Sequence, residues 1–208
     1  MAEHEGSTRI YLVRHGTTLL NRANRYRGRR DVPLDQGGWD DAWGATRLLE
    51  GIELGAVYSS PLRRARDTAR IVADAAGIDR VVDLPGLTNL DYGDWEGLTA
   101  EEAAALDAHA FRGYQHCTPG ARCPGGESLD LGVSRVALSL RSLAALHPGG
   151  TIAAVSHAAI VRLAIVAAGA VERNRWRVAL PNGGVTSFDV TPDGLVAGSF
   201  DRTLATGA

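Results

Sequence analysis

Short apolar segments alternate with longer segments of helical periodicity along most of the chain. The apolar segments, which we predict to be strands, cover residues 9–13, 55–60, 80–84 and 151–157. The helical segments cover residues 39–49, 60–77, 100–109, 128–146 and 158–170. Such alternation is typical of a mostly parallel sheet that carries helices on both of its faces. The sequence therefore predicts an α/β protein with three α/β/α layers.

The ends of the predicted elements carry further signals. The last two apolar segments, "GVTSFDV" and "GLVAGSF", are joined by a turn at "TPDG" and should add an antiparallel edge strand. In the helix over residues 60–77, Ser60 suits the N-cap, Pro61 the first helical position and Gly77 the C-terminal end. The length of 208 residues fits one domain over residues 1–208, with residues 88–130 as an insertion over the functional site.

Composition excludes several classes of protein. The formal net charge is -2, so we expect neither nucleic acid nor a membrane as partner. The N-terminal sequence lacks the pattern of a signal peptide, and the longest apolar run, "AAIVRLAIVAAGAV", is interrupted by Arg162 and is shorter than the roughly 18 residues of a membrane span. We therefore expect a cytoplasmic protein. Cys117 and Cys123 are too few for a tetrahedral zinc site, so we expect no metal, and whether they pair stays open.

Titratable and cationic residues stand directly after three of the predicted strands. In open α/β sheets, ligands bind beyond the carboxyl ends of the strands, so these residues should share one edge. They are Arg14, His15 and Gly16 after the first strand, Ser59, Ser60, Arg63 and Arg64 after the second, and Ser156 and His157 after the strand at Thr151.

This combination suits a phosphoryl substrate. The planar guanidinium of arginine matches phosphate oxygens in a bidentate manner, and helix N-termini add free N–H groups. A neutral imidazole is a competent nucleophile near neutral pH, and Gly16 would let the backbone approach the ligand closely. Arg66 and Arg70 fit better on a solvated helix face. The sequence thus predicts an anion site that contains a nucleophile.

Five ordered motifs extend this prediction: "YLVRHGTTLLN", "SSPLRRARDTA", "DYGDWEGLT", "PGGES" and "AVSHAAIVRLA". They resemble those of the histidine phosphatase superfamily, the phosphoglycerate-mutase-like group, from Ile10 to about Val190. The resemblance implies one histidine-phosphatase domain that needs no cofactor, in which His15 forms a phosphohistidine. It also implies that the same pocket is lined by Arg14, Arg64, His157 and Asn21. Arg64 is preferred to Arg63 because it directly precedes Ala65.

The chain departs from this family at two positions. Thr17 stands where a Glu is common, and Asn89 stands where the family usually places the Glu that acts as general acid. An amide cannot protonate a leaving alkoxide, and general acid catalysis is typically worth about 10²–10⁴-fold. We favour Asp91 as the acid, because in an extended segment it lies on the same side as Asn89.

The presence of Asn89 is also compatible with three further possibilities. The acid could be Glu96, Glu101 or Glu102, although the latter two also suit a solvated helix N-terminus. The leaving group could need little help, as with a phenol, an enol or an anhydride. A degenerate family member could also bind a phospho-ligand without turnover.

The compact chain favours hydrolysis over mutase activity, because mutases of this family tend to be longer. We therefore expect a metal-independent phosphomonoester hydrolase of a small phosphorylated metabolite, such as a sugar phosphate, a phosphoglycerate or α-ribazole phosphate. A phosphoglycerate-type mutase and a non-catalytic binder are the alternatives, and a homodimer is suggested by the family alone. We expect Arg27 of the basic loop over residues 21–31, together with Gly16 and Ser156, to help bind the substrate. Trp39, Trp43 and Trp176 should lie in the core or in an interface. Trp95 should pack against the segment that carries Asp91.

Overall fold

The computed structural model describes residues 6–198. Predictions that fall on residues 1–5 and 199–208, including the end of the last predicted strand, lie outside the described residues. None of the described helices is both long and apolar enough to cross a lipid bilayer.

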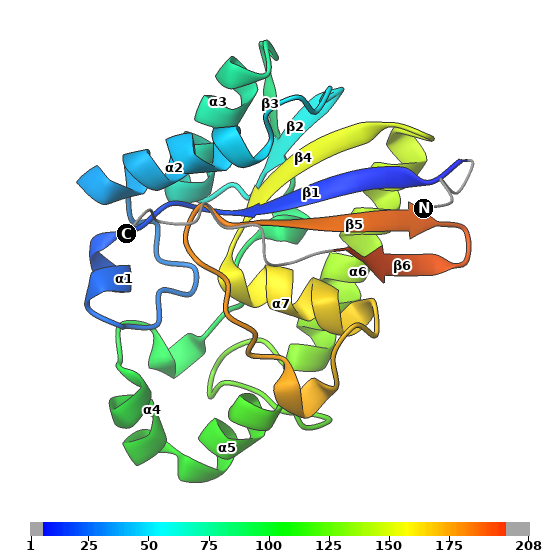
Figure 1. Ribbon diagram of the computed structural model, residues 1–208. Coiled ribbons are helices and arrows are strands. Elements are labelled where there is room, and N and C mark those ends of the chain that lie inside the picture. Colours follow the sequence, from blue (N-terminus) through cyan, green and yellow to red (C-terminus); the bar gives the residue numbers. More distant parts are fainter. Residues whose placement is uncertain (1–5, 199–208) are drawn as a thin grey trace.

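A six-stranded mixed sheet forms the centre of the fold, with strand order β3-β2-β4-β1-β5-β6 (Figure 1). Strands β1, β2, β3 and β4 are parallel, whereas β5 is antiparallel to β1 and to β6. Their bounds are β1 Thr8–Arg14, β2 Ala56–Ser59, β3 Val81–Asp83, β4 Thr151–Ser156, β5 Val185–Thr191 and β6 Gly194–Ala197. The predicted mostly parallel sheet with an antiparallel edge is confirmed.

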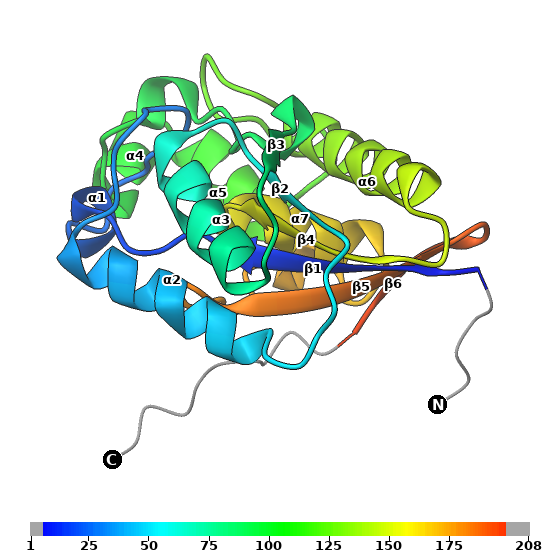
Figure 2. The same cartoon turned by 90° about the horizontal axis from the view of Figure 1, so that it is seen from above.

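Both faces of the sheet are covered by helices (Figures 1 and 2). In β1, Ile10 and Leu12 belong to the core shared with helices α6, Leu129–Leu146, and α7, Ala158–Ala167. The alternate residues Tyr11 and Val13 belong to the core under helices α2, Gln36–Leu48, and α3, Arg63–Ala75. Because successive strand side chains point to opposite faces, a strand buried on both sides reads as one continuous apolar run. This explains why the central strands could be predicted from sequence.

The remaining elements lie beyond the carboxyl ends of β1, β2 and β4. A short helix, α1, covers Leu19–Arg22 at the start of the predicted basic loop. Residues 88–130 contain α4, Ala100–Leu106, and α5, Ala108–His116, which lie away from the sheet in Figure 1. Within residues 6–198 there are also three 3-10 helices, namely η1 Pro85–Leu87, η2 Gly93–Trp95 and η3 Arg173–Arg175.

Two helix boundaries differ from the prediction. Helix α3 begins at Arg63 with Leu62 as its N-cap, so the predicted N-cap Ser60 and first helical residue Pro61 both precede it. The Ser60 N–H instead continues the sheet by donating to the Val155 carbonyl at 2.9 Å. The single helix predicted over residues 100–109 is two helices, because the Asp107 carboxylate caps the N–H groups of His109 and Ala110 and starts α5.

The tryptophans divide between core and surface. Trp95 and Trp176 are fully buried, in agreement with the prediction. Trp39 and Trp43 lie on α2 with 41% and 52% of their surface exposed, so neither belongs to the core. Cys117 and Cys123 are both buried free thiols.

Candidate active site

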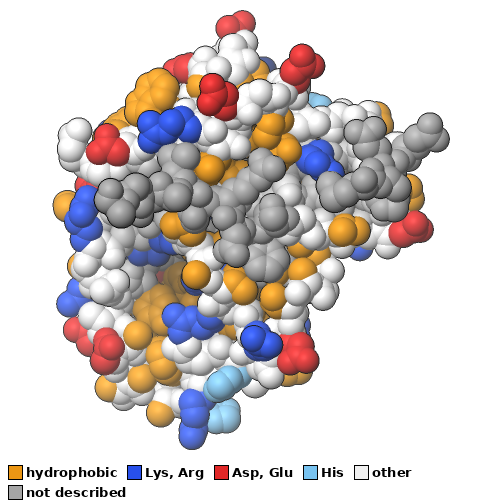
Figure 3. All heavy atoms as spheres, in the orientation of Figure 1, with side chains coloured by type: hydrophobic (Ala, Val, Ile, Leu, Met, Phe, Trp, Pro, Cys, Tyr) orange, Lys and Arg blue, Asp and Glu red, His pale blue; other side chains and the backbone are white. Residues whose placement is uncertain are grey.

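A polar cavity of about 460 Å³ opens where β1 and β4 end. It is lined by five arginines, two histidines, four asparagines and three tyrosines, together with three alanines. On the face shown in Figure 3, blue side chains gather around a hollow, and they are arginines because the chain has no lysine. Of the predicted residues, the structure brings Arg14, His15, Asn21, Arg27 and His157 to this cavity.

His15 lies at the end of β1 with 1% of its surface exposed. Its Nδ1 is 2.6 Å from the Gly16 carbonyl oxygen, which only accepts hydrogen bonds, so Nδ1 carries the proton. The lone pair is then on Nε2, which accepts from the Arg64 Nε–H at 3.3 Å. Burial, followed by the charges of Arg64, Arg14 and Arg27, holds the pKa of His15 well below its usual range. His15 is therefore a neutral imidazole with a defined nucleophilic nitrogen.

Arg64 lies directly behind His15 and is fully buried. Besides His15, its guanidinium donates to the Arg30 carbonyl at 2.7 Å and to the Gly28 carbonyl at 3.0 Å. Burial, reinforced by nearby Arg27, lowers the pKa of Arg64 to about 9. Arg63, the alternative in the sequence, is exposed and pairs with Asp67 on the same helix. The structure thus places Arg64 and not Arg63 against the nucleophile.

Arg14 and Arg27 supply further positive charge. Arg14 donates through Nη1 to the Leu180 carbonyl, and the Nε atoms of both residues are buried without a partner. Burial, with Arg27 and Arg162 nearby, lowers the pKa of Arg14 to about 9. Burial also lowers the pKa of Arg27. Desolvated cations without counter-ions favour an anionic ligand, which would supply the missing charge.

His157 faces His15 at the end of β4, with ring centroids 5.1 Å apart. Its Nε2 is 2.8 Å from Ser60 Oγ, and Ser60 Oγ already accepts from the Leu62 N–H at 3.4 Å. Within the described residues the buried Ser60 hydroxyl has no other acceptor for its proton, so it donates to Nε2, and the proton of His157 is on Nδ1. This buried Nδ1 has no partner in the structure. It is an N–H donor available to a ligand in the cavity.

Asn21 is oriented by the cap of α1. Its Oδ1 accepts from the Thr18 N–H at 3.1 Å and the Thr18 hydroxyl at 2.8 Å. Because the oxygen is used in this way, the amide N–H groups are the part of Asn21 that a ligand can use.

Gly16 and Ser156 lie beside the nucleophile but do not line the cavity. A Cβ on Gly16 would lie 2.0 Å from the Gly38 carbonyl oxygen, so this glycine allows the β1 end to touch the start of α2. The Ser156 hydroxyl is fully buried and donates to the Leu87 carbonyl at 2.7 Å. Both residues support the site in the structure. We expected from sequence that they would help bind the substrate, but neither of them lines the cavity.

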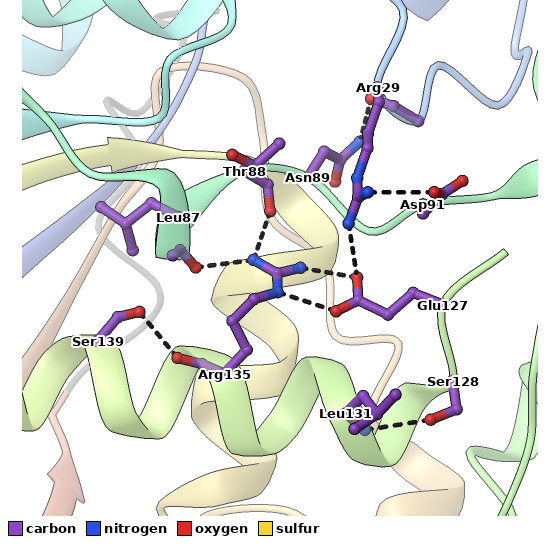
Figure 4. A network of polar contacts seen from close by, with 12 residues as sticks. Arg29, Leu87, Thr88, Asn89, Asp91, Glu127, Ser128, Leu131, Arg135 and Ser139 are labelled. Carbon is purple, nitrogen blue, oxygen red and sulfur yellow. Dashed lines mark hydrogen bonds and ion pairs between the residues drawn. The ribbon is translucent and has the colours of Figure 1, made fainter.

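Asp91 also lies outside the cavity. Its Oδ1 accepts from the Gly93 N–H at 2.9 Å, and its Oδ2 lies 3.2 Å from Arg29 Nη1 (Figure 4). The expected alternation fails because residues 89–92 do not form a strand, and the Asp91 carboxylate instead binds the N–H of Gly93 at the start of η2. Asn89 does line the cavity. The structure therefore does not bring Asp91 together with His15.

The other acidic candidates are engaged elsewhere. Glu96 accepts from the Arg29 N–H at 2.6 Å, and Glu102 caps α4 and pairs with Arg25 at 2.8 Å. Glu101 stands exposed in the first turn of α4, where hydrogen bonds from its own backbone N–H and then from the Thr99 side chain lower its pKa. Among residues 6–198, no Asp or Glu lines the cavity. The described residues also contain no group of three or more His, Cys, Asp or Glu side chains arranged to hold a metal ion.

Several lining residues were not predicted from sequence: Tyr26, Tyr92, Tyr114, Arg162, Arg177 and Asn182. Arg162 had a signal, because it is the one charge in the apolar run of α7 and a buried helix face seldom carries an unexplained cation. The three tyrosines had no recognisable sequence signal, since their position at the cavity depends on how residues 88–130 fold over it. Asn182 donates from Nδ2 to the His15 carbonyl at 3.0 Å.

The fold and the cavity define an α/β protein with an arginine-rich cavity at its strand ends, which contains two buried histidines. The model of one family, described as the histidine phosphatase superfamily (branch 1), matches residues 10–202, and the chain belongs to that superfamily. The sequence resemblance to this family is thereby confirmed.

Two curated relatives place the chain further. It is 40% identical over 159 residues to a bifunctional protein of Mycobacterium tuberculosis, covering 75% of this chain and 43% of that protein. The chain thus spans less than half the length of this relative. It is 34% identical over 157 residues to a metal-independent phosphoserine phosphatase of Arabidopsis thaliana, covering 74% of this chain and 66% of the relative.

Solved structures agree with the fold over almost the whole chain. A mutant phosphoserine phosphatase of Entamoeba histolytica in complex with phosphoserine has a TM-score of 0.85 at 27% identity, covering 96% of this chain and 100% of that one. A putative alpha-ribazole-5'-P phosphatase of Escherichia coli has a TM-score of 0.76 at 26% identity, covering 97% and 100%.

Proposed function

We propose that the protein is a metal-independent phosphatase of a small phosphorylated metabolite and acts through a phosphohistidine on His15. The observation that carries this proposal is the state of His15, a neutral imidazole whose Nε2 lone pair faces unpaired guanidinium groups. A nucleophile in this state needs no prior deprotonation. The surrounding cations suit the charge that a phosphoryl group carries throughout its transfer.

The reaction would take place in two displacements. Nε2 of His15 attacks phosphorus, an N–P bond forms, and the P–O bond to the leaving group breaks. Arg14, Arg64 and the Nδ1–H of His157 hold the phosphoryl oxygens, and Arg64 exchanges its hydrogen bond to Nε2 for one to the substrate. Water then attacks phosphorus, breaks the N–P bond and releases phosphate. Similarity to the Arabidopsis metal-independent phosphoserine phosphatase supports this type of activity.

Two other functions remain as alternatives. Similarity to the Arabidopsis phosphoglycerate mutase-like protein 4, 34% identical over 155 residues, favours a mutase. Asn89, at the position of the usual general acid, favours a protein that binds a phospho-ligand without turnover.

Hydrolysis of p-nitrophenyl phosphate in the presence of EDTA tests the proposal. We expect turnover by the wild type, none by His15→Ala, and a loss of at least about 10²-fold for Arg64→Ala. Arg63→Ala is the matched control, because Arg63 neighbours Arg64 on α3 but is exposed. Loss of turnover on adding EDTA would contradict metal independence. A mutase would need a bisphosphate primer and would give an isomer in place of free phosphate.

A further inference from the structure

The cavity holds more positive charge than one phosphoryl group can neutralise. Four guanidinium groups of partly or fully buried residues line it or contact His15, and within residues 6–198 none of them forms an ion pair: Arg14, Arg27, Arg64 and Arg162. The exposed Arg177 also lines the cavity without an ion pair. A phosphate monoester carries about two negative charges near neutral pH. A surplus of about two positive charges therefore remains for a second anionic group of the same ligand.

The described part of the cavity lacks a group that can protonate a leaving oxygen. Asn89 has only 3% of its surface exposed, and its Nδ2 already donates to the Gly28 carbonyl at 3.1 Å. Its Oδ1, which can only accept, is the atom left without a partner. Asn89 thus offers the leaving group no acidic proton, because its second amide N–H can only donate a hydrogen bond.

The tyrosines of the cavity do not replace the missing acid. Burial raises the pKa of Tyr26, Tyr92 and Tyr114 further from neutrality, which makes these phenols weaker acids than an ordinary tyrosine, although the Tyr26 hydroxyl has no partner and can donate a hydrogen bond. The hydroxyls of Tyr92 and Tyr114 are also bonded to each other at 3.0 Å. A leaving group in this cavity must therefore depart as a stable anion without receiving a proton.

One chemical feature satisfies both observations. We infer that the substrate is an anhydride of phosphoric acid, either a diphosphate or an acyl phosphate, rather than an alkyl phosphate ester. The group that departs is then itself a phosphate or carboxylate anion, which needs no proton and which binds the surplus arginines. This inference rests on the proposed function of His15 and narrows its substrate class.

The bonds and charges of this reaction balance without a further reactant. The electron pair of the broken P–O bond stays on the leaving oxygen, which becomes part of the second phosphate or of the carboxylate. The hydrolytic water gives its oxygen to the phosphoryl group. One of its protons stays on the released phosphate and the other passes to solvent, while the His15 lone pair returns to Nε2.

A comparison of leaving groups on the wild-type protein tests the inference. The probes are pyrophosphate and acetyl phosphate as anhydrides, 3-phosphoglycerate as an alkyl ester with a second anion, and glycerol 3-phosphate as an alkyl ester without one. We expect kcat/KM for both anhydrides to exceed that for 3-phosphoglycerate by at least about 10²-fold, the usual contribution of a general acid. Acid-stable and acid-labile phosphate are measured in the same quenched samples.

Two variants at one position sharpen the test. Asn89→Glu restores a carboxyl group, and at pH 6 it should raise kcat/KM for the alkyl esters far more than for the anhydrides. Asn89→Gln has the same length but no acid proton and should give no such gain. The wild-type comparison does not depend on either variant folding.

The possible outcomes distinguish a failure of the anhydride inference from a failure of the proposed phosphatase function. Equal rates for 3-phosphoglycerate and pyrophosphate, with phosphohistidine formed from both, would overturn the anhydride inference and leave the phosphatase in place. Absence of phosphohistidine with all four probes would overturn both. A preference for anhydrides that only Asn89→Glu relaxes would support the inference.

Discussion

At the scale of single residues, the site depends on where two imidazole rings keep their protons. A backbone carbonyl fixes the proton of His15 on Nδ1, and the Ser60 hydroxyl fixes that of His157 on Nδ1 as well. The consequences differ, because the lone pair of His15 is on Nε2, where it accepts from Arg64, whereas the Nδ1–H of His157 is a donor without a partner. In the proposed function, one nucleophile and one oxygen-binding group arise from the same residue type through their hydrogen-bond partners.

Ser60 should therefore act as a positioning residue. We predict that Ser60→Ala lowers kcat/KM about tenfold, because His157 loses the hydrogen bond that keeps its proton on Nδ1. Ser60→Thr should recover most of this loss, since it keeps the hydroxyl. Nitrogen NMR of the His157 ring checks the cause, and an unchanged tautomer in Ser60→Ala would contradict it.

At the scale of elements, a network of ion pairs and hydrogen bonds around Arg135 and Glu127 holds the segment that carries Asn89 (Figure 4). Arg135 on α6 donates from Nη1 to the Gly86 and Thr88 carbonyls at 2.7 and 2.8 Å, and it binds both oxygens of Glu127. Arg29 of the basic loop joins this network through ion pairs with Glu127 and Asp91. Three segments far apart in sequence are thereby held against each other.

The partly buried pair of Glu127 with Arg135 and the solvated pair of Arg29 with Asp91 should contribute differently to stability. We predict that Glu127→Gln lowers the free energy of unfolding by about 1–3 kcal/mol, because it leaves the partly buried Arg135 without a counter-ion. Asp91→Asn should cost less than about 1 kcal/mol, since its pair with Arg29 is solvated. Urea unfolding measures both. Asp91→Asn should also change hydrolysis of good and poor leaving groups by the same small factor, and a selective loss on poor ones would restore Asp91 as the acid.

The contact between the β1 end and α2 tolerates no added carbon. We predict that Gly16→Ala costs more than about 2 kcal/mol, because the new Cβ would lie 2.0 Å from the Gly38 carbonyl oxygen. Gly55→Ala is the matched control, since its nearest neighbour would be the Thr151 carbonyl oxygen at 3.6 Å. Equal melting temperatures for the two variants would contradict this view of Gly16.

Sequence predicted the elements whose signal is local. Strands β1 and β4 contain continuous apolar runs, and His15 and His157 directly follow these two strands. The side chain of Asp91 could not be placed, because its direction depends on Arg29 and on the bend into η2. Ser60 was wrongly predicted to be a helix cap because its hydroxyl binds His157, which follows β4 and is distant in the sequence. Contacts between distant segments thus account for the errors.

At the scale of the whole molecule, the two buried histidines link stability to pH. Burial and the neighbouring arginines hold the pKa of His15 and His157 well below the usual value, so both rings stay neutral in the folded protein. In the unfolded chain they take up protons below about pH 6.5. Stability present above that pH is therefore lost as the pH falls, by up to about 1.4 kcal/mol per pH unit for each ring.

A non-titrating variant isolates this effect. We predict that the unfolding free energy of His157→Gln declines less steeply than that of the wild type between about pH 6.5 and 5, by the contribution of one ring. His15→Gln should show the same difference. Parallel curves for the wild type and both variants would show that the rings do not carry this pH dependence.

The central claim is that Nε2 of His15 accepts the phosphoryl group. Rapid mixing with acetyl phosphate, an alkaline quench and mapping of the phosphorylated nitrogen test it directly. The account predicts phosphate on Nε2 of His15, formed within one turnover and absent from His15→Ala. Phosphate on Nδ1, on His157, or on no histidine during active turnover would contradict it.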